Sequence, residues 1–194
     1  MPELWKYIAS QLDVVPKMVY LGLLALFCVG ILVLLAVNRK KAGRYFTWLL
    51  FCEYVFLVVG MTVFFRHTST KAMVYPPFWS YASVCRDGDM TVLHEIILNV
   101  VLFVPLGFLW GIPSSKWPRK WQWFGTMVLG VCLSGVIELL QYCFKRGCVE
   151  LDDVIHNTLG CLIGFVLWRG LCEIERQPEK DNMISVDYQK YFEQ

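Results

Sequence analysis

Long apolar runs separated by short polar stretches set the pattern of this chain. The first run covers residues 18–37, and Asn38-Arg39-Lys40-Lys41 follows it directly. About 20 residues at about 1.5 Å each are enough for a helix to cross the hydrocarbon of a bilayer. A signal peptide would have a shorter apolar core and a small-residue cleavage site. This run therefore predicts a retained membrane-spanning helix that ends at a cytoplasmic basic cluster.

Further apolar runs predict four more spans, at residues 45–65, 95–112, 122–144 and 154–172. Helices of this length and character predict an all-α, polytopic membrane protein with about five transmembrane helices, over residues 18–172. Residues 1–17 precede this domain as a short mixed segment that we expect to lie at the membrane interface. Residues 173–194 follow it as a polar tail of alternating charge, expected to be solvated and cytoplasmic.

The composition agrees with this class. Hydrophobic residues make up 57% and charged residues 18% of the chain, and the mean hydropathy is +0.50. Soluble domains rarely reach that balance, so the lipid bilayer is the expected partner. The formal charge of +2 is small, the basic residues are clumped and there is no nucleic-acid motif, which argues against nucleic acid as a partner.

The eight cysteines show no zinc-ligand spacing, and most fall inside the apolar runs, where thiols act as small hydrophobic groups. Cys85 and Cys148 fall instead in loops that we expect on the same side of the membrane. A disulfide between these two residues could form if their backbones come close enough.

Three features interrupt the apolar runs. Glu53 lies near the middle of the second run, where an unpaired carboxylate costs about 2.5–3.5 kcal/mol on insertion scales. We expect it to be neutral, hydrogen-bonded to a neighbouring helix or part of a polar interior, and the interhelical bond is favoured. Pro105 is expected to kink the third span and to free a carbonyl. Gly160 and Gly164 in the fifth span favour close approach of a second helix.

The loops predict the orientation. Placing residues 38–44, 113–121 and the C-terminal tail inside puts most of the 18 lysines and arginines there. The positive-inside rule then predicts an outside N-terminus and a cytoplasmic C-terminus. On this topology residues 66–93 form an outer, aromatic-rich loop, in which Pro76-Pro77 disfavours helix.

It also follows that the polar ends of the third, fourth and fifth spans all face out, beside a short charged segment at residues 145–153. Polar groups at the membrane edge are costly, so we expect a role that offsets the cost. The residues predicted to line this outer vestibule are His94, Glu95, Asn99, Glu138, Gln141, Arg146, Glu150, Asp152, Asp153, His156 and Asn157.

Three kinds of chemistry fit this vestibule. Glu138, Asp153 and His156 are candidate catalytic residues, in general acid–base work on an envelope substrate. The candidate binding residues are Asn99, Gln141, Arg146, Asp152 and Asn157, and an arginine such as Arg146 could hold an anionic group. A divalent metal is the second alternative, but no HExxH-like spacing occurs, so neither a metal nor a cofactor is predicted. Thirdly, the acidic cluster could bind a cationic ligand or simply order the helices.

Asp153 has a competing interpretation. It lies in the first turn of the fifth helix, where a carboxylate is favourable toward the positive helix end. Capping and function therefore both remain open for this residue.

At these residues the chain resembles the VanZ-like family. Pro77-Phe78-Trp79-Ser80-Tyr81 is similar to the family's Pro-Phe element, and Asn99-x-x-x-Phe103-x-Pro105-x-Gly107 to its Asn…Phe-x-Pro-x-Gly helix. The C-terminal signature is matched by Glu138-x-x-Gln141, Arg146 and Glu150-x-Asp152-Asp153-x-x-x-Asn157-x-x-Gly160. The resemblance covers about residues 75–168. It departs at Glu150, where the family usually has aspartate, and at Arg146-Gly147, where it often has Gly-Arg.

The resemblance implies an integral membrane protein of mainly Gram-positive bacteria, associated with resistance to the glycopeptide antibiotic teicoplanin. It implies no settled reaction, so whether the chain is an enzyme stays open. The leading hypothesis is an outward-facing polar site that acts on or shields a cell-envelope component, with lipid-linked cell-wall precursors or the glycopeptide itself as partners. The alternative is a non-enzymatic binding or scaffold protein whose polar residues only lock the helices. A small transporter or channel is the third hypothesis.

Overall fold

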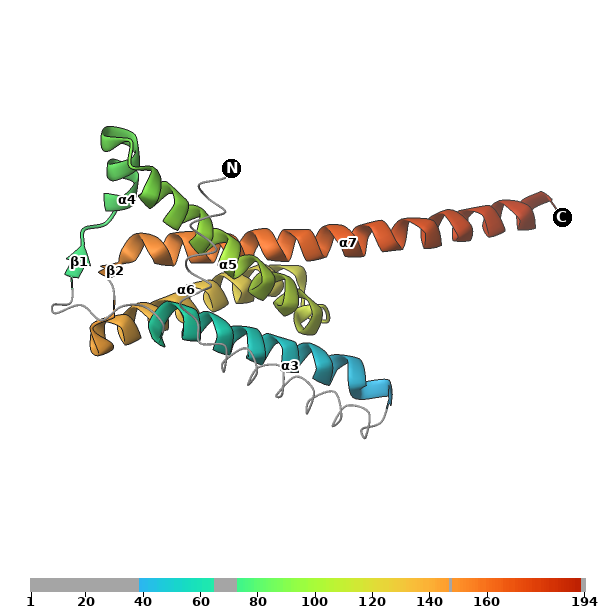
Figure 1. The fold of residues 1–194 in the computed structure, drawn as a ribbon. Helices are drawn as coiled ribbons and strands as arrows, with labels where there is room; N and C mark the ends of the chain where they lie inside the picture. Colours follow the sequence, from blue (N-terminus) through green and yellow to red (C-terminus); the bar gives the residue numbers. More distant parts are fainter. Residues whose placement is uncertain (1–38, 65–72, 147, 193–194) are drawn as a thin grey trace.

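The computed structural model describes residues 39–64, 73–146 and 148–192 (Figure 1). Its main helices are α3 (Arg39–Val59), α5 (Met90–Ser114), α6 (Arg119–Phe144) and α7 (Leu151–Phe192). A π-helix, η1 (Gly60–Phe64), extends α3. The predicted interfacial segment, residues 1–17, and the predicted first span, residues 18–37, lie outside the described residues.

The described part contains four stretches long and apolar enough to cross a membrane: Tyr45–Val63, Met90–Ser114, Arg119–Phe144 and Leu151–Ile174. The predicted class, an all-α polytopic membrane protein, is confirmed. The third span begins at Met90 instead of residue 95, because Asp89 caps its first turn. The Asp89 carboxylate accepts from the N–H groups of Thr91 at 2.9 Å and Val92 at 3.3 Å.

The loop before α5 contains regular structure that the sequence did not predict. Strand β1 (Met73–Tyr75) is followed by the short helix α4 (Trp79–Ala82) and a π-helix, η2 (Ser83–Asp87). Helix α4 begins at Trp79, two residues after Pro77, so the paired prolines precede a helix instead of excluding one. Strand β1 pairs in parallel with β2 (Cys148–Glu150), with Tyr75 opposite Glu150.

Helices α5 and α7 meet backbone to backbone. A Cβ atom built on Gly107 would lie 1.8 Å from the carbonyl oxygen of Cys161, and one on Gly164 would lie 1.9 Å from that of Val104. The same test at Gly160 gives 2.2 Å to the Val100 oxygen. The close approach predicted from Gly160 and Gly164 is therefore confirmed, with Gly107 as the matching position on α5.

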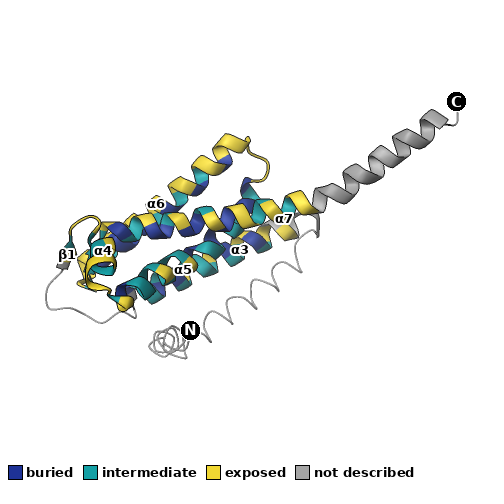
Figure 2. Cartoon of the chain, turned by 90° about the horizontal axis from the view of Figure 1, so that it is seen from above, coloured by how far each residue is buried: buried dark blue, intermediate teal, exposed yellow. Residues whose placement is uncertain are grey.

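The core lies between the helices, and their outer faces are apolar. The buried core residues are Phe51, Val58, Val63, Phe103, Leu106, Ile137 and Cys161. In Figure 2 the buried positions line the faces where helices meet, and exposed positions face away from the bundle. Many exposed positions carry large apolar side chains, such as Phe56, Leu139 and Val166, which suits a surrounding lipid bilayer.

Three local features of the sequence can be compared with the structure. Helix α5 continues through Pro105, and the Tyr54 hydroxyl of α3 donates to the Leu102 carbonyl near this proline at 3.0 Å. Glu53 was expected to hydrogen-bond to a neighbouring helix, but its Oε1 atom is buried and has no hydrogen-bond partner. Cys85 and Cys148 are both free, so the disulfide that could join them is not formed.

The polar ends of the helices gather at one end of the bundle. Strands β1 and β2 and helix α4 lie together there, beside the start of α7, while the turn between α5 and α6 lies at the opposite end (Figure 1). The predicted convergence of polar span ends is therefore present in the fold. Helix α7 runs from this end through the bundle and continues to Phe192, so the backbone of most of the predicted tail is helical.

Candidate functional site

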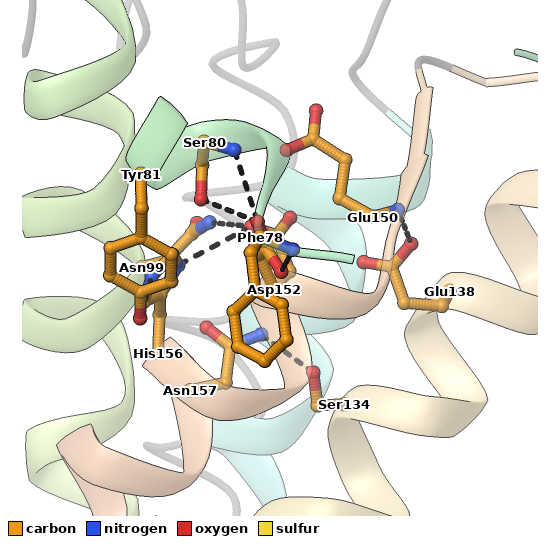
Figure 3. Close-up of polar contacts among 11 residues, drawn as sticks. Phe78, Ser80, Tyr81, Asn99, Ser134, Glu138, Glu150, Asp152, His156 and Asn157 are labelled. Atoms are coloured by element: carbon orange, nitrogen blue, oxygen red, sulfur yellow. Dashed lines mark hydrogen bonds and ion pairs between the residues drawn. The ribbon is translucent and has the colours of Figure 1, made fainter. Parts of the chain in front are cut away.

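The candidate site is a cluster of polar side chains at the β1–β2 end, contributed by α4, α5, α6 and the first turns of α7 (Figure 3). We call it the polar cluster; its members are Ser80, Tyr81, Asn99, Ser134, Glu138, Asp152, Asp153, His156 and Asn157. Asp152, His156, Asn157, Ser134 and Glu138 are buried. Desolvated polar groups are tolerated only where partners or a function compensate, so each bond matters.

Asp152 holds the loop that precedes α5. Its Oδ1 accepts from the backbone N–H of Phe78 at 2.6 Å, and its Oδ2 accepts from the N–H of Ser80 at 3.0 Å and the Ser80 hydroxyl at 2.7 Å. These bonds close the first turn of α4 and fix Phe78 in the left-handed region, with φ 64°. A phenylalanine adopts that region only at some cost in free energy. The three hydrogen bonds of Asp152, which we call the clamp, therefore stabilise a strained turn.

The clamp presents aromatic rings at the surface of the cluster. Phe78 is 63% exposed, and its ring lies 6.3 Å, centroid to centroid, from that of Tyr81. Tyr75 and Trp79 stack beside them, with centroids 4.0 Å apart. The polar cluster therefore has an aromatic rim.

A chain of polar contacts runs inward from this rim. The hydroxyl of Tyr81 and Nε2 of His156 are 2.9 Å apart. Nδ1 of the same ring faces Oδ1 of Asp153 at 3.9 Å, which is beyond hydrogen-bond distance. Nδ2 of Asn99 donates to that oxygen at 2.6 Å. The sequence therefore placed Asn99, Asp153 and His156 correctly near one another, and Tyr81 is the group that it missed.

Tyr81 can meet either tautomer of the His156 ring. Burial raises the pKa of Tyr81, and the negative charge of Asp152 raises that pKa further. The phenol therefore stays protonated at neutral pH, and its hydroxyl can donate to Nε2 or accept from it, depending on the tautomer of the ring. When the phenol donates, the proton of a neutral imidazole lies on Nδ1, which faces Asp153 and has no hydrogen-bond partner.

The second half of the cluster joins α6 to α7 and to β2. Nδ2 of Asn157 donates to the Ser134 hydroxyl at 2.8 Å, and Oδ1 of Asn157 is buried without a partner. Oε2 of Glu138 accepts from the backbone N–H of Glu150 at 2.9 Å. Glu138 therefore holds β2 directly, from a buried position at one side of the cluster.

Gln141 and Arg146 are placed differently. Nε2 of Gln141 donates to the Thr62 carbonyl in η1 at 3.0 Å, so this amide faces α3 and its continuation instead of α7. Arg146 follows Lys145, whose left-handed backbone ends α6, and its N–H donates to the Gln141 carbonyl at 2.9 Å. The anion-binding role expected of Arg146 stays a prediction.

The rim is acidic around Tyr75. Burial raises the pKa of this phenol, and Cys148, Glu150 and Glu95 raise it further through charge and a hydrogen bond. Glu95 and Glu150 were both expected in this vestibule. Among the described residues, no group of three or more His, Cys, Asp and Glu side chains lies close enough together to hold a metal ion.

The missed groups are short polar residues and backbone amides. Ser80 and Tyr81 stand inside the Pro-Phe element, and Ser134 lies one helical turn before Glu138, but no spacing shows which partner each one meets. The spacing of Ser134, Glu138 and Gln141 marks one polar face of α6, and this spacing could have identified Ser134 as a member of the site.

Fold and cluster together define a small polytopic membrane protein with a polar end built on an aromatic loop and the start of its last span. The sequence model of the VanZ/LLP1 family matches residues 51–173, well over half of the chain. The chain belongs to this family, and the resemblance drawn from its motifs is confirmed.

One curated relative is Protein VanZ of Enterococcus faecium, which is 29% identical over 75 residues. The match covers 39% of this chain and 44% of that protein, so the chain spans less than half the length of this relative. No solved structure matches the chain.

Proposed function

We propose that the polar cluster faces the outside of the cell and binds a component of the cell envelope, on which it acts or which it shields. In this role the protein lowers susceptibility to teicoplanin. Lipid-linked peptidoglycan precursors, or their peptide termini, are the proposed ligands. The amide, hydroxyl and carboxylate groups of such molecules are matched by the imidazole, amide and carboxylate groups of the cluster.

The observation that carries this proposal is a set of buried, unsatisfied atoms. Nδ1 of His156 and Oδ1 of Asn157 have no hydrogen-bond partner, although both side chains are almost fully buried. Each such group costs about 1–3 kcal/mol when desolvated, so structure alone gives no reason to keep it. A bound ligand, or a second arrangement of the cluster, would supply the missing partners.

Charge supports the outward orientation. Lys116, Arg119 and Lys120 flank the turn between α5 and α6, which lies at the end of the bundle opposite the polar cluster. The positive-inside rule favours the cytoplasm for that turn and therefore the outside for the cluster. The orientation is tested by reporter fusions that end within residues 145–150, and a cytoplasmic reporter at that point would overturn the proposal.

A second candidate is a non-enzymatic scaffold, which a different observation favours. Each of four acidic or amide side chains joins two elements: Asp152 joins α7 to α4, Asp153 joins α7 to α5, Asn157 joins α7 to α6, and Glu138 joins α6 to β2. On this view the same residues lock the helices, and the outer surface only binds a lipid, antibiotic or protein.

The deciding experiment measures teicoplanin susceptibility of a sensitive Gram-positive host that expresses either the wild type or Asp153→Asn, with membrane levels matched. Asparagine keeps the size of the side chain and removes its charge. Protection by the wild type alone supports a functional charge at Asp153. Loss of the protein from the membrane supports the scaffold, and equal protection by both would remove Asp153 from the site.

A further inference from the structure

We propose that Tyr81 is the group through which the polar cluster exchanges a proton with its ligand, with His156 and Asp153 acting behind it. This inference rests on the proposed function and deepens it. It assigns the ligand a hydroxyl, or another protic group of similar acidity, that comes within hydrogen-bond distance of the Tyr81 oxygen.

The first support is a gradient of exposure along the contact chain. Tyr81 is 39% exposed, whereas His156 behind it is 2% exposed. A ligand at the aromatic rim therefore meets the phenol and not the imidazole. Because the phenol oxygen lies 2.9 Å from Nε2, a proton arriving at the rim has a direct path to the buried ring.

The second support is the unpartnered nitrogen. A histidine kept only for structure would normally have both ring nitrogens hydrogen-bonded. Here Nδ1 is buried and unpartnered, 3.9 Å from Oδ1 of Asp153. The gap is short enough for the carboxylate to stabilise an imidazolium, and catalytic hydrogen bonds often tighten only when a ligand is bound.

The third support is that both ends of the chain are held in place. Asp152 clamps α4, the helix that carries Tyr81, through three hydrogen bonds. Asn99 donates to Asp153 at 2.6 Å and orients its carboxylate. Asp152 and Asn99 are thus positioning residues, and Tyr81 is the group that touches the ligand.

The proton balance closes without a further reactant. The ligand O–H proton passes to the Tyr81 oxygen as the original phenolic proton passes to Nε2 of His156. Tyr81 ends neutral, His156 becomes an imidazolium beside Asp153, and the ligand oxygen keeps the electron pair of the broken O–H bond. The reverse sequence returns the proton to a leaving group.

The contact chain itself is tested by nitrogen NMR of the full-length protein in lipid nanodiscs, with ¹⁵N-labelled histidine. The chain holds three histidines, and a His156→Gln variant assigns the signal of interest. In the wild type we expect the neutral ring to be protonated at Nδ1. In Tyr81→Phe the Nε2 signal should shift toward that of a nitrogen without a donor. Tyr75→Phe is the matched control and should leave the His156 signals unchanged.

An unchanged His156 spectrum in Tyr81→Phe would overturn the inference. If Tyr81→Phe does not accumulate, a fluorinated tyrosine introduced at position 81 keeps the hydroxyl and the packing but makes the phenol more acidic. We then expect the Nε2 signal of His156 to shift, because a more acidic phenol is a stronger hydrogen-bond donor. A His156 spectrum identical to that of the wild type would overturn the inference in this variant too.

The role toward the ligand is tested separately, by teicoplanin susceptibility at matched membrane levels. Tyr81→Phe is expected to lose protection, while Tyr142→Phe, at an exposed position of α6 outside the rim, keeps it. If the wild type protects and Tyr81→Phe protects equally, the inference fails and the proposed function stands. If the wild type gives no protection, the proposed function fails, and the role of Tyr81 toward the ligand is rejected with it.

Discussion

The carboxylate of Asp152 accepts a hydrogen bond from the backbone N–H of Phe78 at 2.6 Å, across 74 residues of sequence. This contact joins the start of the last span to the aromatic loop, and the two bonds to Ser80 complete the attachment. The geometry of the rim therefore depends on a residue of α7. The aspartate of the family motif has a structural task that its position in the motif does not reveal.

Replacing Asp152 by alanine should release the loop. Hydrogen bonds to a charged acceptor contribute about 1.5–3 kcal/mol each, and the substitution removes all three together. We expect a clear loss of thermal stability in detergent, with faster proteolysis between residues 73 and 89. Ser80→Ala loses only the hydroxyl bond, so its loss should be smaller. Wild-type stability of Asp152→Ala would contradict the clamp.

Charge removal at Asp153 should affect function more than folding. Asparagine can still accept the bond from Asn99, so Asp153→Asn should change the free energy of unfolding by less than about 1 kcal/mol. The charge beside His156 is nevertheless lost. Thermal unfolding and teicoplanin susceptibility measured on the same variant separate the two effects. A large loss of stability would assign Asp153 to structure.

The α5–α7 contact should not tolerate a larger residue. In Gly164→Ala the new methyl group would lie 1.9 Å from the Val104 carbonyl oxygen, so the helices must separate. Overpacking of this kind costs about 1–3 kcal/mol. Gly170→Ala, on the same helix, is the control because nothing lies within 4 Å of its new methyl group. Thermal unfolding of both variants should show a loss at position 164 alone.

Tyr75 and Tyr81 should titrate at a higher pH than an ordinary phenol. Burial is the main cause that raises the pKa of Tyr75 and of Tyr81, and negative charges nearby raise both further. The folded protein therefore holds these protons more tightly than the unfolded chain does. The resulting stabilisation is complete below the unfolded pKa of about 10 and is lost as pH rises through the folded value.

Difference titrations measure this directly. Tyrosinate absorbance of the wild type minus that of Tyr81→Phe isolates Tyr81, and Tyr75→Phe isolates Tyr75 in the same way. Each difference curve should have its midpoint above about 10, the ordinary value of a phenol. A midpoint at the ordinary value for either residue would show that its hydroxyl is solvated in the folded protein.

The helix boundaries show how accurately the pattern of apolar residues predicts the spans. The apolar runs located all four described spans within a few residues, because each span must cover the same hydrocarbon thickness. The error at the start of α5 came from a polar capping residue, Asp89, which lies outside the apolar run. The strands β1 and β2 could not be seen in the sequence, because each has three residues and finds its partner far along the chain.

The sequence by itself determined the membrane class, the spans in the described part and the gathering of polar groups at one end. These follow from apolar length and from the spacing of residues on single helices. Only the tertiary structure decided that Asp152 binds the loop, that Tyr81 meets His156 and that Gln141 faces η1. The rotation of one helix against another depends on packing between distant segments, such as the glycine contact of α5 with α7, and no local spacing encodes it.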